Sequence, residues 1–228
     1  MSIGSIVVLV AFFVGINVWN TYRNAATFPQ FWEAKANEPI PTNAIRVVAL
    51  GDSATQAIGA DQPMDGFVGR IATYVQAKTG RPVHITNVSV GGATYTDVVQ
   101  KQLPQVDLKT ADLVIVESSN DVEQRVPLDT FRAALDALMQ VLPADKTLIS
   151  DLPLEPGRDA YQTILQERAD AAHLMRADFA HIFTHEGRRL DIFSWLFPHL
   201  NTKGYGYWFL AFQPSVDTIL QHRKEQKI

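Results

Sequence analysis

The stretch I-R-V-V-A-L-G-D-S-A-T, residues 45–55, joins a short apolar run to a turn that contains a serine. The run over 45–50 is rich in β-branched and aliphatic residues, and it has the length of a strand buried on both faces. Gly51 and the polar residues after it favour a sharp turn. A serine in such a strand-to-helix turn presents its hydroxyl and its own backbone N–H at the edge of a sheet. Ser53 is therefore a candidate nucleophile, and its structural alternative is a helix cap.

Beyond this stretch, apolar runs alternate with amphipathic segments to the end of the chain. Gly or Pro stands where these segments end or begin, as at Gly80 and Pro127. Strands that alternate with helices predict a parallel sheet covered on both faces, which is an α/β fold built as a three-layer α/β/α sandwich. The predicted strands are 45–50, 83–88, 113–117, 147–150 and 179–183, and the predicted helices are 66–78, 96–102, 127–141, 159–178 and 202–223.

The amino-terminal part of the chain has a composition of its own. Residues 3–19 carry no charged side chain, and their length is near the lower limit for crossing a hydrocarbon core of roughly 30 Å. We expect a transmembrane helix over 1–19 that anchors an extracytoplasmic catalytic domain; a cleaved signal peptide, with secretion, or a buried helix is the alternative. Pro29, Pro39 and Pro41 favour an extended linker over 20–43, which leaves 44–228 as one domain.

Composition narrows the function classes. A length of 228 residues suits one domain, and a net charge of -4 with 46% hydrophobic residues favours neither a nucleic-acid partner nor disorder. The chain has no cysteine, which excludes disulfides, cysteine nucleophiles and thiolate metal sites. A P-loop and a dinucleotide fingerprint are absent, and His181 and His185 lack the H-E-x-x-H order of a zinc site. We expect no metal and no cofactor.

Three further loops carry groups that fit the chemistry of acyl transfer. Because the carboxyl ends of parallel strands meet at one edge of a sheet, these loops are expected to lie near Ser53. Gly92 allows a backbone N–H to approach a ligand, and the Asn120 amide can donate to developing negative charge. His199, before the last predicted helix, can act as a base. Each has a structural alternative as a turn or cap residue, but together they supply a nucleophile, two oxyanion donors and a base.

This ordered set resembles the SGNH, or GDSL-type, hydrolase family over about residues 45–212. The resemblance implies a flavodoxin-like SGNH fold and hydrolysis through an acyl-enzyme, with Ser53 as nucleophile, Gly92 and Asn120 in the oxyanion hole together with the Ser53 N–H, and His199 as base. The matching blocks are V-A-L-G-D-S at 48–53, N-V-S-V-G-G at 87–92, S-S-N-D at 118–121 with Ser for the usual leading Gly, and H-L-N at 199–201 followed by G-Y at 204–205.

The last block departs from the family pattern. Leu196 stands where the family has the acid that orients the histidine, and Leu200 replaces a proline. Three consequences stay open: a backbone carbonyl near Leu196 orients His199, Asp191 orients it, or the chain is a degenerate relative that binds without turnover.

Activity is favoured because the four site residues occur together. The expected function is that of a serine esterase, lipase or acetylesterase acting on lipid or cell-envelope glycan acyl groups. The expected partners are a small acyl ester or acylated glycan and, through the amino-terminal segment, a membrane, with no nucleic acid; the oligomeric state is not predicted. The alternatives are a weakened SGNH-like binding domain and an O-acyltransferase.

Overall fold

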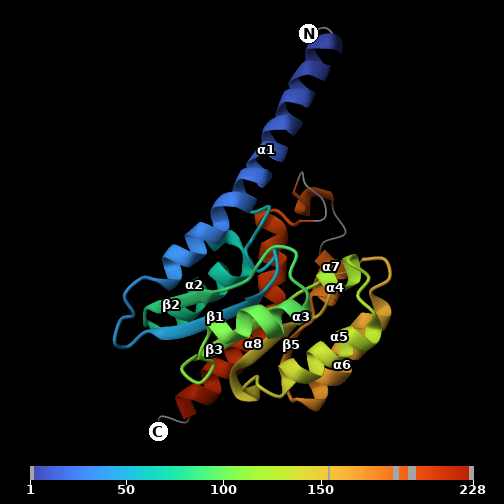
Figure 1. Ribbon diagram of the computed structural model, residues 1–228. Coiled ribbons are helices and arrows are strands. Elements are labelled where there is room, and N and C mark those ends of the chain that lie inside the picture. The colour runs from blue at the N-terminus through green and yellow to red at the C-terminus, as the bar shows by residue number, and fades with distance from the viewer. Residues whose placement is uncertain (1–2, 154, 187–189, 195–198, 226–228) are drawn as a thin grey trace.

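The computed structural model describes residues 3–153, 155–186, 190–194 and 199–225. Within them, strands in the order β2-β1-β3-β4-β5 form one sheet, and all neighbouring strands are parallel. Helices cover both faces (Figure 1), which confirms the predicted three-layer α/β sandwich. The strands are β1 (Ile45–Gly51), β2 (Val83–Asn87), β3 (Leu113–Glu117), β4 (Thr147–Ser150) and β5 (Met175–Ala177), and the α-helices are α1 (Ile3–Ala36), α2 (Phe67–Thr79), α3 (Tyr95–Asp97), α4 (Asn120–Glu123), α5 (Leu128–Met139), α6 (Asp159–Ala171), α7 (Phe179–Glu186) and α8 (Thr202–Glu225).

The two faces of strand β1 explain why residues 47–50 are apolar at consecutive positions. Ile45, Val47 and Ala49 belong to one buried cluster, whereas Val48 and Leu50 belong to another on the opposite face. The first cluster includes side chains from α1, α2 and α8, and the second includes side chains from α5 and α6. Because helices cover both faces, side chains on both sides of the strand must be apolar.

The register of β1 places the candidate loops next to one another. Ala49 pairs with Asn87 of β2, and Gly51 pairs with Glu117 of β3. The loop that carries Ser53 therefore leaves the sheet between the loops that follow β2 and β3. This is the carboxyl edge at which the sequence predicted a site.

The predicted fifth strand is wrong. The sequence predicted a helix to residue 178 and a strand over 179–183, but the structure ends α6 at Ala171, forms β5 at Met175–Ala177 and begins α7 at Phe179. His173, with a φ of 55°, turns the chain out of α6, and Asp178 Oδ1 accepts a hydrogen bond of 2.8 Å from the His181 N–H at the start of α7. A run as short as F-A-H-I-F fits either kind of element, and the cap decides it.

The amino-terminal segment also differs from its prediction. α1 continues through Pro29 to Ala36, so the first part of the expected extended linker over 20–43 is helical. A proline inside a helix loses one backbone hydrogen bond, and the burial of the neighbouring Phe28 and Trp32 in the first cluster offsets that loss.

Among the residues that the structure describes, no helix combines the length and the apolarity that crossing a membrane requires. The transmembrane helix predicted over 1–19 therefore has no support from the structure.

Candidate active site

The turn after β1 fixes Ser53 at the carboxyl edge of the sheet. Gln102, which is fully buried, accepts a hydrogen bond from the Gly51 N–H (2.8 Å) and donates one to the Gly51 carbonyl (2.7 Å). Gly51 has a φ of 152°, and a Cβ there would lie 1.8 Å from the backbone oxygen of Glu117. Only glycine fits this close approach of β1 to β3. Asn87 Nδ2 donates to the Thr55 carbonyl at 2.9 Å, which ties the far side of the turn to β2.

The structure brings His199 to Ser53, 146 positions away in the sequence. The His199 Nε2 atom lies 3.1 Å from Ser53 Oγ, and both residues are half-buried. This distance is within hydrogen-bond range, so a neutral imidazole could accept the hydroxyl proton here. Gly59 permits the approach of the two loops: its φ is 98°, and a Cβ on it would lie 2.4 Å from the Leu200 carbonyl oxygen.

The loop before His199 is held by Asn201, the asparagine of the fourth block. Its amide donates to the backbone oxygens of Asp191 (2.7 Å) and Phe193 (3.1 Å), while its own oxygen accepts from the N–H groups at the start of α8. The Asp191 carboxylate is exposed and forms an ion pair of 2.6 Å with Lys203. Leu196, at the position of the family's acid, lies outside the described residues.

The two candidate oxyanion donors border the same space. Gly92 has a φ of 79°, in the left-handed region, and its carbonyl accepts a hydrogen bond of 2.7 Å from Gln124. Asn120 donates one amide hydrogen to Asp52 Oδ2 at 2.6 Å. Both residues line a cavity of about 970 Å³ together with Ser53 and His199. The structure thus gathers all four residues that the sequence singled out.

A group of buried carboxyl side chains lies beneath the serine turn. Asp52 is 1% exposed and accepts hydrogen bonds from the N–H groups of Ala54 and Ser119 in addition to that from Asn120. Glu117 is 2% exposed, and burial together with the charge of Asp52 raises the pKa of Glu117 well above its ordinary value. The neutral form of the Glu117 carboxyl is therefore favoured by its burial and by the nearby charge of Asp52.

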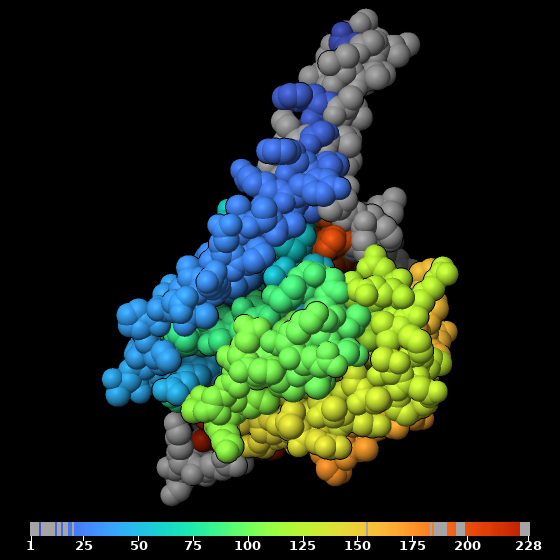
Figure 2. All heavy atoms as spheres, viewed as in Figure 1, coloured from blue at the N-terminus to red at the C-terminus, as the bar shows by residue number. Residues whose placement is uncertain are grey.

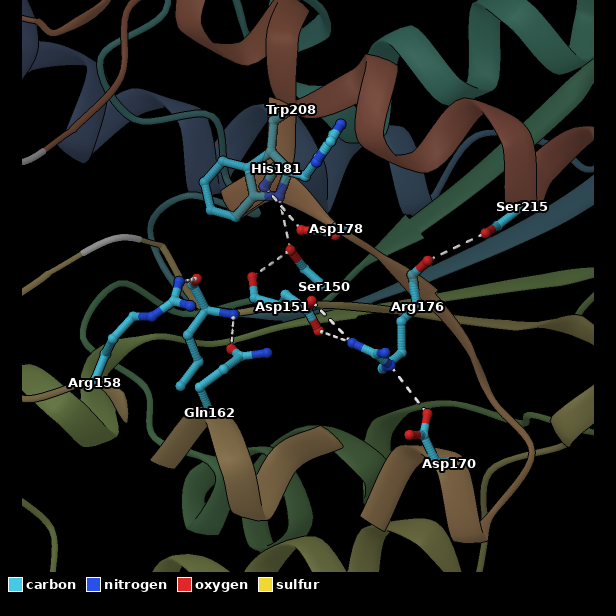
Figure 3. A network of polar contacts seen from close by, with 11 residues as sticks. Ser150, Asp151, Arg158, Gln162, Asp170, Arg176, Asp178, His181, Trp208 and Ser215 are labelled. Carbon is cyan, nitrogen blue, oxygen red and sulfur yellow. Dashed lines mark hydrogen bonds and ion pairs between the residues drawn. The ribbon is translucent and has the colours of Figure 1, made fainter. Parts of the chain in front are cut away.

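Aromatic side chains form part of the cavity wall. Trp208 stacks on Phe179 with ring centroids 4.4 Å apart, and both line the cavity. Figure 3 shows how the indole is held: Trp208 Nε1 donates to Ser150 Oγ at 2.8 Å. The neighbouring Asp151, 2% exposed, accepts two hydrogen bonds of 2.9 Å from Arg176. The end of β4 thereby fixes this wall.

Acidic residues occupy another part of the cavity lining. Glu123 and Glu155 are lining residues, and burial, followed by the charge of Glu123, raises the pKa of Glu155 to about 7. The described part of the chain contains no group of three or more His, Asp or Glu side chains placed to hold a metal ion.

Sequence reasoning missed the supporting residues of the site. Glu117 ends an otherwise apolar strand, L-V-I-V-E, and a charged residue in that position is a signal of a buried functional environment. Gln102 carried no comparable signal, because amide side chains are common in loops and helices, whereas Asn201 was already part of the fourth block of the family resemblance.

Comparison with known proteins agrees with this geometry. Residues 49–207 match the model of the GDSL-like lipase/acylhydrolase family, well over half of the chain. Fold and match together identify an ester hydrolase. More specifically, the chain belongs to the GDSL-like lipase/acylhydrolase family. A search of curated proteins gave no match.

Solved structures share the fold at low sequence identity. The chain is similar to TesA, with 16% identity, a TM-score of 0.65, and coverage of 76% of this chain and 99% of TesA. It is also similar to a lipase/acylhydrolase from Enterococcus faecalis, with 20% identity, a TM-score of 0.62, and coverage of 75% and 94%. A third similar structure is that of Axe2, an acetylxylan esterase from Geobacillus stearothermophilus. It has 17% identity and a TM-score of 0.57, and the match covers 75% of this chain and 93% of Axe2.

Proposed function

We propose that this ester hydrolase works through an acyl-enzyme formed on Ser53. The observation that carries the proposal is the 3.1 Å contact between Ser53 Oγ and His199 Nε2 in a cavity that Gly92 and Asn120 also line. His199 takes the hydroxyl proton as Oγ attacks the carbonyl carbon, and the imidazolium then protonates the leaving alcohol. Water attacks the acyl-enzyme by the same route, which releases the acid and restores the serine.

The proposed oxyanion donors are the backbone N–H groups of Ser53 and Gly92 and the amide of Asn120. Asp52 holds one amide hydrogen of Asn120 at 2.6 Å, and this contact directs the group before substrate binds. The second amide hydrogen is the one that we assign to the oxyanion. Donors held in place in this way stabilise the tetrahedral intermediate without the cost of reorientation.

We further propose that a backbone carbonyl, and not Asp191, orients His199. Supporting this choice, the Asp191 carboxylate is paired with Lys203 at 2.6 Å and is exposed. A carbonyl acceptor fixes the imidazole tautomer but provides less stabilisation of the imidazolium than a carboxylate does.

The experiment compares hydrolysis of p-nitrophenyl acetate and butyrate by the full chain and by variants. Ser53→Ala and His199→Ala should each reduce kcat by at least about 10³-fold, and Ser53→Ala should abolish labelling by a fluorophosphonate. Asp191→Asn should change kcat less than about 10-fold, whereas an orienting acid would cost about 10⁴-fold. Asp129→Asn, at an exposed side chain of α5, is the matched control. Turnover that survives Ser53→Ala would refute the proposal.

A further inference from the structure

Helix α1 lies outside the segment that matches the family, yet it borders the cavity. The match covers residues 49–207, whereas Tyr22, Ala25 and Pro29 of α1 line the same cavity as Ser53 and His199. Their spacing of three and then four residues places them on one face of the helix. Figure 1 shows α1 running along the body of the protein and continuing past it toward the amino terminus.

The helix is attached to the turn that carries the candidate nucleophile. Trp32 Nε1 donates to the Gln56 carbonyl at 3.0 Å, and Asn24 Nδ2 donates to the Ala60 carbonyl at 2.9 Å. Trp32 is 2% exposed, Phe28 5% and Asn24 7%, so this second face of α1 is packed into the domain. Both acceptors lie within seven residues of Ser53, and the hydrogen bonds therefore fix the distance between the helix and the serine.

The side chains that α1 turns toward the cavity are uncharged. Tyr22, Ala25 and Pro29 share the lining with the aromatic side chains of Phe179 and Trp208, whereas the acidic side chains of the lining belong to other elements. A volume of about 970 Å³ is far larger than an acetyl group requires. An apolar chain is the part of an ester that gains free energy from such a wall.

From these observations we infer that α1 is a wall of the substrate cavity that sets the size of the apolar chain of the ester. Ala25 is the position at which a larger side chain would shorten the space. This inference rests on the proposed function for its assignment of the cavity to substrate, and it adds the substrate class: esters whose apolar chain is longer than acetyl.

The test compares Ala25→Trp with Ala26→Trp in the full chain. Ala25 and Ala26 are both exposed, but only Ala25 belongs to the cavity lining, so Ala26→Trp places the same bulky side chain on a different face of the helix. With p-nitrophenyl esters of 2 to 12 carbons, Ala25→Trp should lower kcat/KM for the octanoate about 10-fold and change the acetate less than about 3-fold. Ala26→Trp should leave the whole series within about 2-fold.

A second variant and a second series keep the test decisive. Tyr22→Ala removes bulk from the wall, so it should raise kcat/KM for longer esters relative to shorter ones. This variant replaces Ala25→Trp in the test if Ala25→Trp does not fold. If the acyl series is unchanged, alkyl acetates from methyl to octyl test the alcohol side of the ester. A uniform effect of Ala25→Trp at every length, or no length dependence in either series, would overturn the inference.

Binding without turnover separates this inference from the proposed function. In a Ser53→Ala background, calorimetry with ethyl octanoate should show affinity about 10-fold weaker with Ala25→Trp and unchanged with Ala26→Trp. If this difference in affinity appears although the unsubstituted chain cleaves no ester, the inference about α1 is supported and the proposed mechanism is refuted. If the unsubstituted chain cleaves esters but the difference in affinity is absent, the inference about α1 is refuted and the proposed mechanism is retained.

Discussion

Replacing Asp121 by asparagine should remove a pH-dependent loss of stability. Asp121 is fully buried, and its Oδ2 accepts a hydrogen bond of 2.8 Å from the Tyr95 N–H. Burial, helped by the charge of Asp52, raises the pKa of Asp121 from 3.8 to about 6. At about 1.4 kcal/mol for each unit of pKa, the ionised side chain costs the folded state roughly 3 kcal/mol.

The sign of the effect follows from proton binding. Between pH 4 and pH 6 the folded protein holds the Asp121 proton more tightly than the unfolded chain does, so the free energy of unfolding falls as pH rises through this range. The stabilisation that the protonated Asp121 side chain gives the folded state is complete below about pH 4 and is lost above about pH 7. Asparagine keeps an acceptor for the Tyr95 N–H and has no charge to bury, so the variant should lack this fall.

The assay is urea unfolding of the protein and of Asp121→Asn at several pH values from 4 to 8. The free energy of unfolding of the variant minus that of the unsubstituted protein should rise by roughly 3 kcal/mol across this range. Asp129→Asn, whose side chain is 97% exposed, is the control and should give a flat difference. A flat difference for Asp121→Asn as well, or a variant that loses stability as pH rises, would refute the reasoning.

Three further predictions concern the serine turn and the core. Burial and the charge of Asp52 raise the pKa of Glu117 well above its ordinary value, so Glu117→Gln, which puts a neutral side chain of the same size there, should keep kcat at pH 7 within about 3-fold in the ester assay; a loss larger than about 10-fold would contradict this reasoning. Gly51→Ala should cost roughly 3 kcal/mol or more in urea unfolding, because the new Cβ meets the Glu117 carbonyl, and an unchanged midpoint would show that β1 and β3 can separate. Leu135→Ala, at a fully buried position of α5, should cost about 2–5 kcal/mol in the same assay.

Most of the sheet was predictable because its strands are buried on both faces. Consecutive apolar residues such as those of β3 have few other uses in a chain of this length, and the predicted β3 and β4 agree with the structure to the residue. β5 was not predictable, because Met175–Ala177 is short and half-polar while the next segment is more apolar. The cap at Asp178, not hydropathy, makes that segment a helix.

The four candidate residues were predictable from the sequence for a geometric reason. Ser53, Gly92 and Asn120 each follow a strand by a few residues, and the carboxyl ends of parallel strands lie at the same edge of the sheet. His199 follows no strand directly; it was assigned to the set as a base in the loop before the last predicted helix, and the family resemblance supported that assignment. Its contact with Ser53 depends on Gly59, whose left-handed backbone allows the two loops to approach.

Helix α1 shows where this kind of prediction ends. Pro29 argued for an extended chain, and the aromatic spacing of Phe28, Phe31 and Trp32, which suits one side of a helix, is too short a pattern to outweigh it. What makes the segment helical is burial of that side against β2 and the serine turn, a contact between parts of the chain that no local pattern encodes. In the proposed mechanism, the residues that perform the chemistry all lie within the segment that matches the family. Residues that select one ester over another would then lie outside the matched segment. In this chain Tyr22, Ala25 and Pro29 of α1 lie outside that segment and line the cavity, which is why we assign the selection of the ester to them.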